Sequence, residues 1–97
     1  PMGPAITPTR YIGDPMNLKM KLWVNGELMQ DSNSGQMIFT IADQIEHLSS
    51  CITLQPGDII LTGTPAGVGM ARKKFLRPGD VAKQWIENIG EFEFSIA

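Results

Sequence analysis

The clearest pattern in the chain is an alternation of apolar positions with polar or aromatic ones over residues 18–24. A period of two predicts a strand with one buried face. Asn25-Gly26 follows at once, and this dipeptide favours the positive φ angles of a type I′ turn. Residues 18–24 and 27–30 are therefore predicted to form a β-hairpin.

Residues 31–36 are predicted to be a polar loop, and residues 37–39 are a short apolar run. A helical pattern follows them. The apolar residues Ile41, Ile45 and Leu48 recur at helical spacing. Thr40 suits the N-cap position, and Asp43 would lie near the unpaired amides of the first turn. The pattern predicts one short amphipathic helix over residues 40–50.

Two Pro-Gly-Asp turns, at residues 55–58 and 77–80, divide the second half of the chain. The first precedes the apolar run 59–61, which predicts a short strand buried on both faces and the centre of the fold. The second precedes residues 81–87, which with the alternating residues 91–96 predict a closing pair of strands. Residues 1–16 hold four of the seven prolines and are predicted to be an irregular lead-in. The expected fold class is mainly β with one short helix, α+β.

Composition limits the classes of function. The 97 residues allow one domain or part of one. A net charge of −2, with Arg72-Lys73-Lys74 as the longest basic run, indicates no nucleic-acid partner. The single cysteine favours a reducing cytoplasm. No apolar run approaches the roughly 20 residues that span a bilayer, and no basic and apolar leader opens the chain, so no membrane partner is expected. Because the chain starts at Pro1, an upstream part is expected to have been removed.

The strongest candidate for chemistry is the glycine-rich segment 61–69, LTGTPAGVG. Such loops expose backbone amides and can bind anions. The segment lacks the Gly-Lys-Ser/Thr ending of a P-loop, and no helical pattern follows it as in a dinucleotide fold, so nucleotide binding is disfavoured. Composition leaves two interpretations open: an anion-binding loop, or glycines that only permit tight turns.

Five ordered runs of residues carry a resemblance to a known family. They are residues 1–4 (PMGP), 22–27 (LWVNGE), 37–39 (MIF), 54–69 (LQPGDIILTGTPAGVG) and 75–81 (FLRPGDV). In sequence and in order they resemble the fumarylacetoacetate hydrolase family over essentially the whole chain. The resemblance implies that residues 1–97 are the C-terminal part of a catalytic domain with a mixed β-roll fold.

The resemblance also implies a divalent metal, magnesium, manganese or calcium, bound by carboxylates. In the family a Glu-x-Glu motif, an aspartate and a nearby lysine precede the match to Gly3-Pro4, and none of them is present here. The metal ligands and catalytic groups are therefore expected outside this chain. The one Glu-x-Glu, Glu91-Phe92-Glu93, lies at the wrong end of the family order, and alternation directs both carboxylates to solvent. What carries over is Gly63-Thr64, which in the family lines the substrate pocket.

The function that the resemblance implies is cleavage of a carbon–carbon bond in a β-diketo or 2-oxo acid, or a related decarboxylation or isomerisation. The parent protein is expected to be an enzyme, and this chain alone to be inactive. The expected partners are a small oxo acid and a second copy of the full-length protein. Two alternatives remain: a β-rich binding or dimerisation module that has lost the metal, and a companion polypeptide that carries the missing part.

Other reactive or aromatic residues have simpler interpretations. His47 is expected to be a surface or boundary histidine, because no acidic partner or nucleophile can be placed beside it. Cys51 is expected to be a buried, inert thiol. Trp23 and Trp85 are expected to pack in the protein or at a subunit interface. Residues 72–73 could steer anionic substrates, although an exposed loop charge is the commoner meaning.

Overall fold

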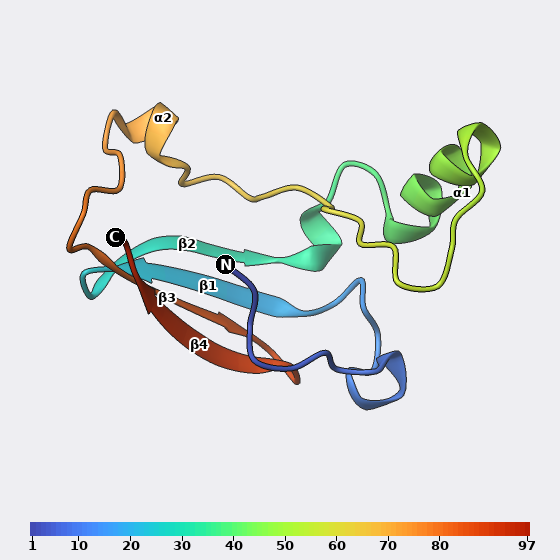
Figure 1. Cartoon of the computed structure of the whole chain (residues 1–97), viewed down its shortest axis with the longest axis horizontal. Helices are drawn as coiled ribbons and strands as arrows, with labels where there is room; N and C mark the ends of the chain where they lie inside the picture. Colours follow the sequence, from blue (N-terminus) through green and yellow to red (C-terminus); the bar gives the residue numbers. More distant parts are fainter.

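The structure is a computed structural model that describes all 97 residues (Figure 1). Four strands form one antiparallel sheet in the order β2-β1-β3-β4. The strands are β1 (Lys19–Val24), β2 (Glu27–Asn33), β3 (Val81–Ile86) and β4 (Gly90–Ser95). The helices are α1 (Ile41–Cys51) and the one-turn α2 (Gly69–Arg72), with short 3-10 helices at Thr9–Tyr11 and Ser34–Gln36. The expected fold class, β-rich with one main helix, is confirmed. Both predicted strand pairs are present, but β2 runs to Asn33, three residues into the predicted loop at 31–36.

The β1–β2 hairpin turns at Asn25-Gly26, as predicted. Asn25 has φ 51° and Gly26 has φ 80°, the two positive angles that a type I′ turn requires. The register then shifts: Leu22 pairs with Gln30 but Trp23 pairs with Leu28, which leaves Met29 as the extra residue of a β-bulge. Met29 is one of the few buried residues of the chain.

The two faces of the sheet differ in chemistry. One face is mainly apolar, with Ala82 buried opposite Phe94 and the rings of Phe92 and Phe94 stacked 5.4 Å apart. The N-terminal segment lies against this face, since a Cβ on Gly3 would come 3.6 Å from the Phe92 ring. The other face carries Trp23 and Trp85, each paired across β1 and β3 with a lysine. Both tryptophans are half-buried on this charged face.

Helix α1 begins where the sequence predicts. The Thr40 hydroxyl accepts from the amide of Asp43 at 3.1 Å, and the Asp43 carboxylate accepts from the amide of Thr40 at 2.8 Å. This reciprocal pair is a capping box, which satisfies two amides of the first turn. The helix ends at Cys51, one residue beyond the predicted range.

Residues 59–61 are not the strand that the apolar run predicts. They are irregular and their backbone groups form no hydrogen bond with other backbone groups; Ile59 is 67% exposed and Leu61 is 91% exposed. A buried strand needs neighbouring strands and covering layers, and residues 59–61 have neither here. The core lies instead on the sheet and its flanks, where Ile12, Leu18, Met29 and Ala82 are buried.

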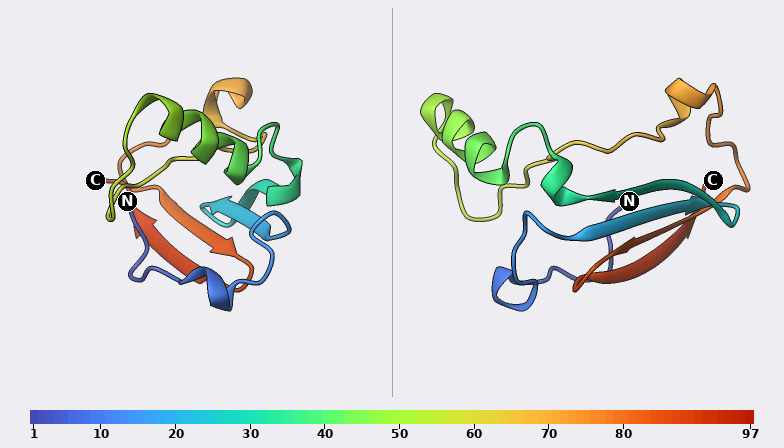
Figure 2. Two further views of the ribbon diagram at one scale, coloured as in Figure 1. Left: turned by 90° about the vertical axis from the view of Figure 1, so that its right-hand side faces the viewer. Right: turned by 180° about the vertical axis from the view of Figure 1, so that it is seen from behind.

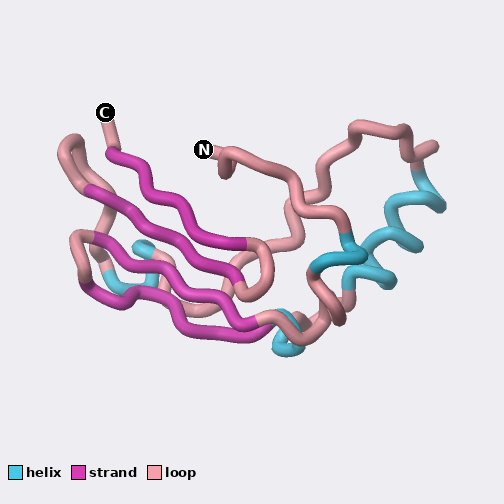
Figure 3. Tube along the Cα trace, turned by 90° about the horizontal axis from the view of Figure 1, so that it is seen from below, coloured by secondary structure: helices cyan, strands magenta, loops and turns pink.

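The chain outside the sheet is extended. Helix α1 lies beyond one end of the sheet, and the segment after it returns along β2 to α2 (Figure 2). Viewed from below, the four strands occupy one end of the molecule and α1 the other (Figure 3). Neither helix has the length and hydrophobicity that crossing a bilayer requires. The returning segment brings the glycine-rich loop to the outer edge of β2.

Candidate substrate-binding site

A cleft of about 680 Å³ lies where the returning segment passes the end of β2. Its walls are residues 31–34, 36–39 and 62–66, with Met20 and Gln44. The cleft therefore includes Gly63 and Thr64, the two residues for which the family resemblance implies substrate binding. Its only charged lining residue is Asp31, which forms an ion pair with Lys21 at 3.6 Å. The remaining polar groups of the wall are neutral hydroxyls, amides and backbone.

Thr64 is held in place by Gln30 of β2. The Gln30 Nε2 atom lies 2.9 Å from the Thr64 hydroxyl oxygen and 2.8 Å from the carbonyl oxygen of Pro65. Gln30 is half-buried, whereas Thr64 is exposed to the cleft. One strand side chain thus fixes both the hydroxyl and the backbone of the loop.

Two glycines give the loop its course. Gly63 has φ 105° and Gly67 has φ 111°, conformations that L residues rarely adopt. A Cβ on Gly63 would meet nothing within 4 Å, so only the backbone angle demands glycine there. A Cβ on Gly67 would collide with the carbonyl oxygen of Met29. At Gly67 glycine is required both for its angle and for the close approach to the bulge of β2.

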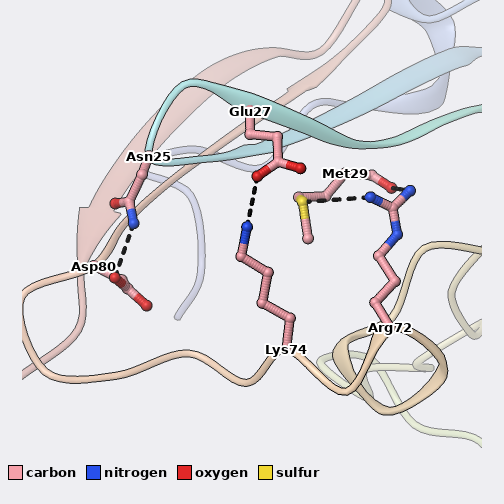
Figure 4. Close-up of polar contacts among 6 residues, drawn as sticks. All are labelled: Asn25, Glu27, Met29, Arg72, Lys74 and Asp80. Carbon is pink, nitrogen blue, oxygen red and sulfur yellow. Dashed lines mark hydrogen bonds and ion pairs between the residues drawn. The ribbon is translucent and has the colours of Figure 1, made fainter.

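The segment after the loop is fastened to the same hairpin (Figure 4). Arg72, the last residue of α2, donates through its guanidinium to the carbonyl oxygen of Met29 at 3.2 Å. Lys74 forms an ion pair with Glu27 at 2.6 Å. Residue 72 is exposed, as predicted, but it ends the one-turn helix α2 instead of lying in a loop. Its guanidinium contacts the protein backbone at the bulge residue of β2.

The hairpin turn is tied to the start of β3. The Asn25 side chain donates to Asp80 at 2.8 Å and accepts from the amide of Val81 at 2.9 Å. The bond from Asn25, together with the amide of Arg77, lowers the pKa of Asp80 below its ordinary value. The hydrogen bond from Lys74 likewise lowers the pKa of Glu27. Both carboxylates therefore stay charged and hold these contacts through the neutral pH range.

The carboxylates of this chain do not form a metal site. Glu91 and Glu93 are exposed, and Glu91 forms an ion pair with Lys83 at 3.0 Å. No group of three or more His, Cys, Asp or Glu side chains lies close enough together to hold a metal ion. The residues present therefore do not fit the divalent metal that the family resemblance implies.

The remaining reactive residues lie away from the cleft, on α1. His47 is exposed, which agrees with a surface histidine. Cys51 is also exposed, so the prediction of a buried thiol is wrong. The reason is that α1 lies beyond the end of the sheet and buries none of its residues.

Residues 1–97 match the family described as fumarylacetoacetate (FAA) hydrolase, C-terminal, over their full length. The chain belongs to the fumarylacetoacetate hydrolase family. Oxaloacetate tautomerase Fahd2a, mitochondrial, of Rattus norvegicus is a relative with 51% identity over 92 residues, which cover 93% of this chain and 29% of the relative. This chain thus spans about a third of the curated relatives it matches.

Solved structures of the family share the fold of this chain. Maleylpyruvate hydrolase from Sphingobium sp. SYK-6, in complex with manganese(II) and pyruvate, aligns with a TM-score of 0.87 and 42% identity, over 96% of this chain and 33% of that protein. The 2-hydroxyhepta-2,4-diene-1,7-dioate isomerase from Mycobacterium marinum aligns with a TM-score of 0.74 and 40% identity, over 84% of this chain and 30% of that protein. The relatives named here are thus described as a hydrolase, an isomerase and a tautomerase.

Sequence reasoning missed Gln30, which it placed only as the last residue of a predicted strand. Gln30 and Thr64 are 34 positions apart, and no local pattern links them. The alternation in β2 sets which face Gln30 occupies, but its partner follows only from the path of the returning segment.

Proposed function

We propose that this chain is the substrate-contacting, C-terminal part of a longer, divalent-metal-dependent enzyme that acts on a small 2-oxo or β-diketo acid. The observation that carries the proposal is the placement of Gly63 and Thr64 in the wall of the 680 Å³ cleft, in a chain of this family. The structural relative that contains manganese and pyruvate, a 2-oxo acid, supports the substrate class.

The groups in the cleft suit hydrogen bonding to substrate oxygens. Thr64 offers a hydroxyl, and the amides of Gly63 and Thr64 take part in no backbone–backbone hydrogen bond. Donors fixed before substrate arrives stabilise negative charge without reorganising, which is the basis of oxyanion-type binding. In this proposal Gly63 and Thr64 bind and orient a carboxylate or enolate oxygen.

The charge of the cleft supports a divided site. Its walls contain no lysine or arginine, and Asp31 is acidic, so these residues alone do not neutralise an oxo acid. We place the metal and its carboxylate ligands outside this chain, where the metal would supply the missing positive charge. The longer protein would be a homodimer, or a companion chain would carry the other part. We place it in a reducing compartment such as the cytoplasm, on the basis of its single cysteine.

The reaction that we propose first is hydrolytic cleavage of a carbon–carbon bond. The hydrolase among the structural relatives supports it, while the tautomerase and isomerase relatives support proton transfer on the same class of acid. In each case the role of this chain is the same, since Thr64 and the adjoining amides hold a substrate oxygen while bonds change elsewhere.

The test is to replace Thr64 by Val in the full-length protein. The loss of one donor to a charged oxygen should lower kcat/KM by about 10- to 100-fold. Affinity for manganese alone should stay within about twofold, because Thr64 binds substrate and not metal. Thr53, an exposed threonine outside the cleft, provides the control, and Thr53→Val should leave kcat/KM unchanged.

The substrate class is tested by calorimetric titration of manganese and then oxalate, a mimic of a 2-oxo acid, into the full-length protein. Oxalate binding that depends on manganese is expected. Its absence would refute the proposed substrate class. Intact mass spectrometry of the same sample reveals a companion chain if one supplies the metal ligands.

A further inference from the structure

The direction of the hydrogen bond between Gln30 and Thr64 is fixed by a third group. Both short contacts are made by one atom, Nε2 of Gln30, with the Thr64 hydroxyl and with the carbonyl oxygen of Pro65. A carbonyl oxygen only accepts, so the amide must present its NH₂ group to this side. A reversed amide would place two acceptor oxygens 2.8 Å apart. The Thr64 hydroxyl therefore accepts from Gln30.

This constraint determines what the hydroxyl can offer to the cleft. A threonine hydroxyl has one proton and two lone pairs. Because one lone pair is engaged by Gln30, and Gln30 presents no acceptor on this side, the proton remains for another partner. Thr64 is exposed in the wall of the cleft, and the structure gives its hydroxyl no other side-chain bond. The proton is therefore available to an acceptor in the cleft.

Gln30 is well placed to impose this direction. It pairs with Leu22 in the sheet and follows the bulge residue Met29, so its backbone is fixed at the point where the loop passes closest to β2. Its two N–H groups are shared between the hydroxyl and the backbone of consecutive residues. The side chain thus couples the position of the loop to the polarity of its hydroxyl.

We propose that Gln30 is a positioning residue that holds the Thr64 hydroxyl as a hydrogen-bond donor and thereby selects substrates that present an acceptor oxygen, such as a carboxylate. The inference rests on the proposed function, because it assigns a selectivity to the same cleft. A ligand with an ammonium or N–H group at this point would face a donor and be disfavoured.

The experiment is a double-mutant cycle on the full-length protein, with oxalate as the probe in the presence of saturating manganese. Gln30→Met removes the donor and keeps the chain length, and Gln30→Glu keeps the shape but presents only acceptors when ionised. Each is measured alone and together with Thr64→Val. Manganese is also titrated by itself, as a control for the metal site.

We expect Gln30→Glu to weaken oxalate binding by about tenfold or more, because its carboxylate accepts the hydrogen bond that the Thr64 hydroxyl would otherwise donate to the ligand, and its negative charge repels oxalate. Gln30→Met should weaken binding by about threefold, since the hydroxyl is then free to rotate. In the Thr64→Val background Gln30→Met should weaken oxalate binding by less than about twofold, because the hydroxyl through which Gln30 acts is gone. The loss from Gln30→Glu should become smaller there, and what remains is the repulsion of its negative charge.

A pH series separates this role from simple support of the loop. Below about pH 5 the introduced carboxyl of Gln30→Glu takes up a proton and regains a donor. The affinity of Gln30→Glu relative to Gln30→Met, each measured at the same pH, should rise there. The rise should be smaller in the Thr64→Val background, where the regained donor can only support the loop through Pro65. The Asp31–Lys21 ion pair, whose Asp31 lies in the cleft wall, is present in both variants and is therefore common to the two affinities that are compared.

The proposal would be overturned if the Gln30 variants lost the same oxalate affinity in the wild-type and Thr64→Val backgrounds. That result would mean that Gln30 acts only through Pro65. Unchanged oxalate affinity in both Gln30 variants would also overturn it. If one variant does not fold, the other still completes the cycle with Thr64→Val. A wild-type protein that binds manganese but not oxalate would instead refute the proposed function, which keeps the two failures distinct.

Discussion

The replacement of Gly67 by Ala tests how closely the glycine-rich loop must approach β2. Gly67 has φ 111°, and an alanine there would place its Cβ against the carbonyl oxygen of Met29. The unfavourable angle alone costs about 1–3 kcal/mol, offset by about 0.4–1 kcal/mol from the lower entropy of the unfolded chain. Relief of the collision requires the loop to leave the bulge and weakens the bonds from Gln30 and Arg72, at about 1 kcal/mol each.

The expected result is that Gly67→Ala lowers the free energy of unfolding by about 2–4 kcal/mol. The matched control is Gly57→Ala, at a turn where φ is 99° and a Cβ meets nothing within 4 Å. It carries the strain of the angle without the collision and should cost only about 0.5–2 kcal/mol. Urea denaturation of the two variants provides the comparison.

Activity gives a second measurement on the same pair. Because the displaced loop carries Thr64, Gly67→Ala should also lower kcat/KM of the full-length protein by at least about tenfold. Gly57→Ala should leave kcat/KM near the wild-type value, since its turn lies outside the cleft. If Gly67→Ala proves no more damaging than Gly57→Ala in either assay, the close contact with Met29 does not position the loop.

Two further predictions concern the contacts that fix the hairpin and α1. Asn25→Gly keeps the positive φ but removes the bonds to Asp80 and Val81, so it should lower the free energy of unfolding by about 1–3 kcal/mol, as measured by urea denaturation. Asn25→Ala should lose more, because alanine also carries the strain of φ 51°. The bonds from the side chain and then the backbone of Thr40 lower the pKa of Asp43, so this contribution to stability is present at neutral pH and lost as the pH falls through the folded pKa. Thr40→Ala should destabilise the protein by about 0.5–2 kcal/mol at neutral pH, with a smaller effect at acid pH below the folded pKa of Asp43, as measured by thermal unfolding.

The elements that the sequence predicts correctly are those specified by nearby residues. Asn25-Gly26 sets the hairpin turn through its own φ angles, and Thr40 with Asp43 closes a capping box within four residues. Each of these signals contains both partners of its interaction in a short window, so a pattern search finds them.

The errors involve partners that are distant in sequence. Residues 59–61 have the composition of a buried strand, but burial depends on neighbours that composition does not specify. The prediction that the Cys51 thiol is buried is wrong for the same reason, since its exposure follows from where α1 lies relative to the sheet. The contact of Gln30 with Thr64 could not be predicted from local sequence, because it depends on the path of the whole returning segment.

The register of the hairpin links the local turn signal to the contact between distant residues. Because Trp23 pairs with Leu28 and Leu22 with Gln30, the extra residue falls at Met29 and its carbonyl oxygen accepts from Arg72. The next residue, Gln30, then contacts Thr64 through its side chain. A shift of one residue would turn the Gln30 side chain to the opposite face of the sheet and away from the loop. The Asn25-Gly26 turn, which the sequence specifies most strongly, therefore also sets the orientation of the hydroxyl in the cleft.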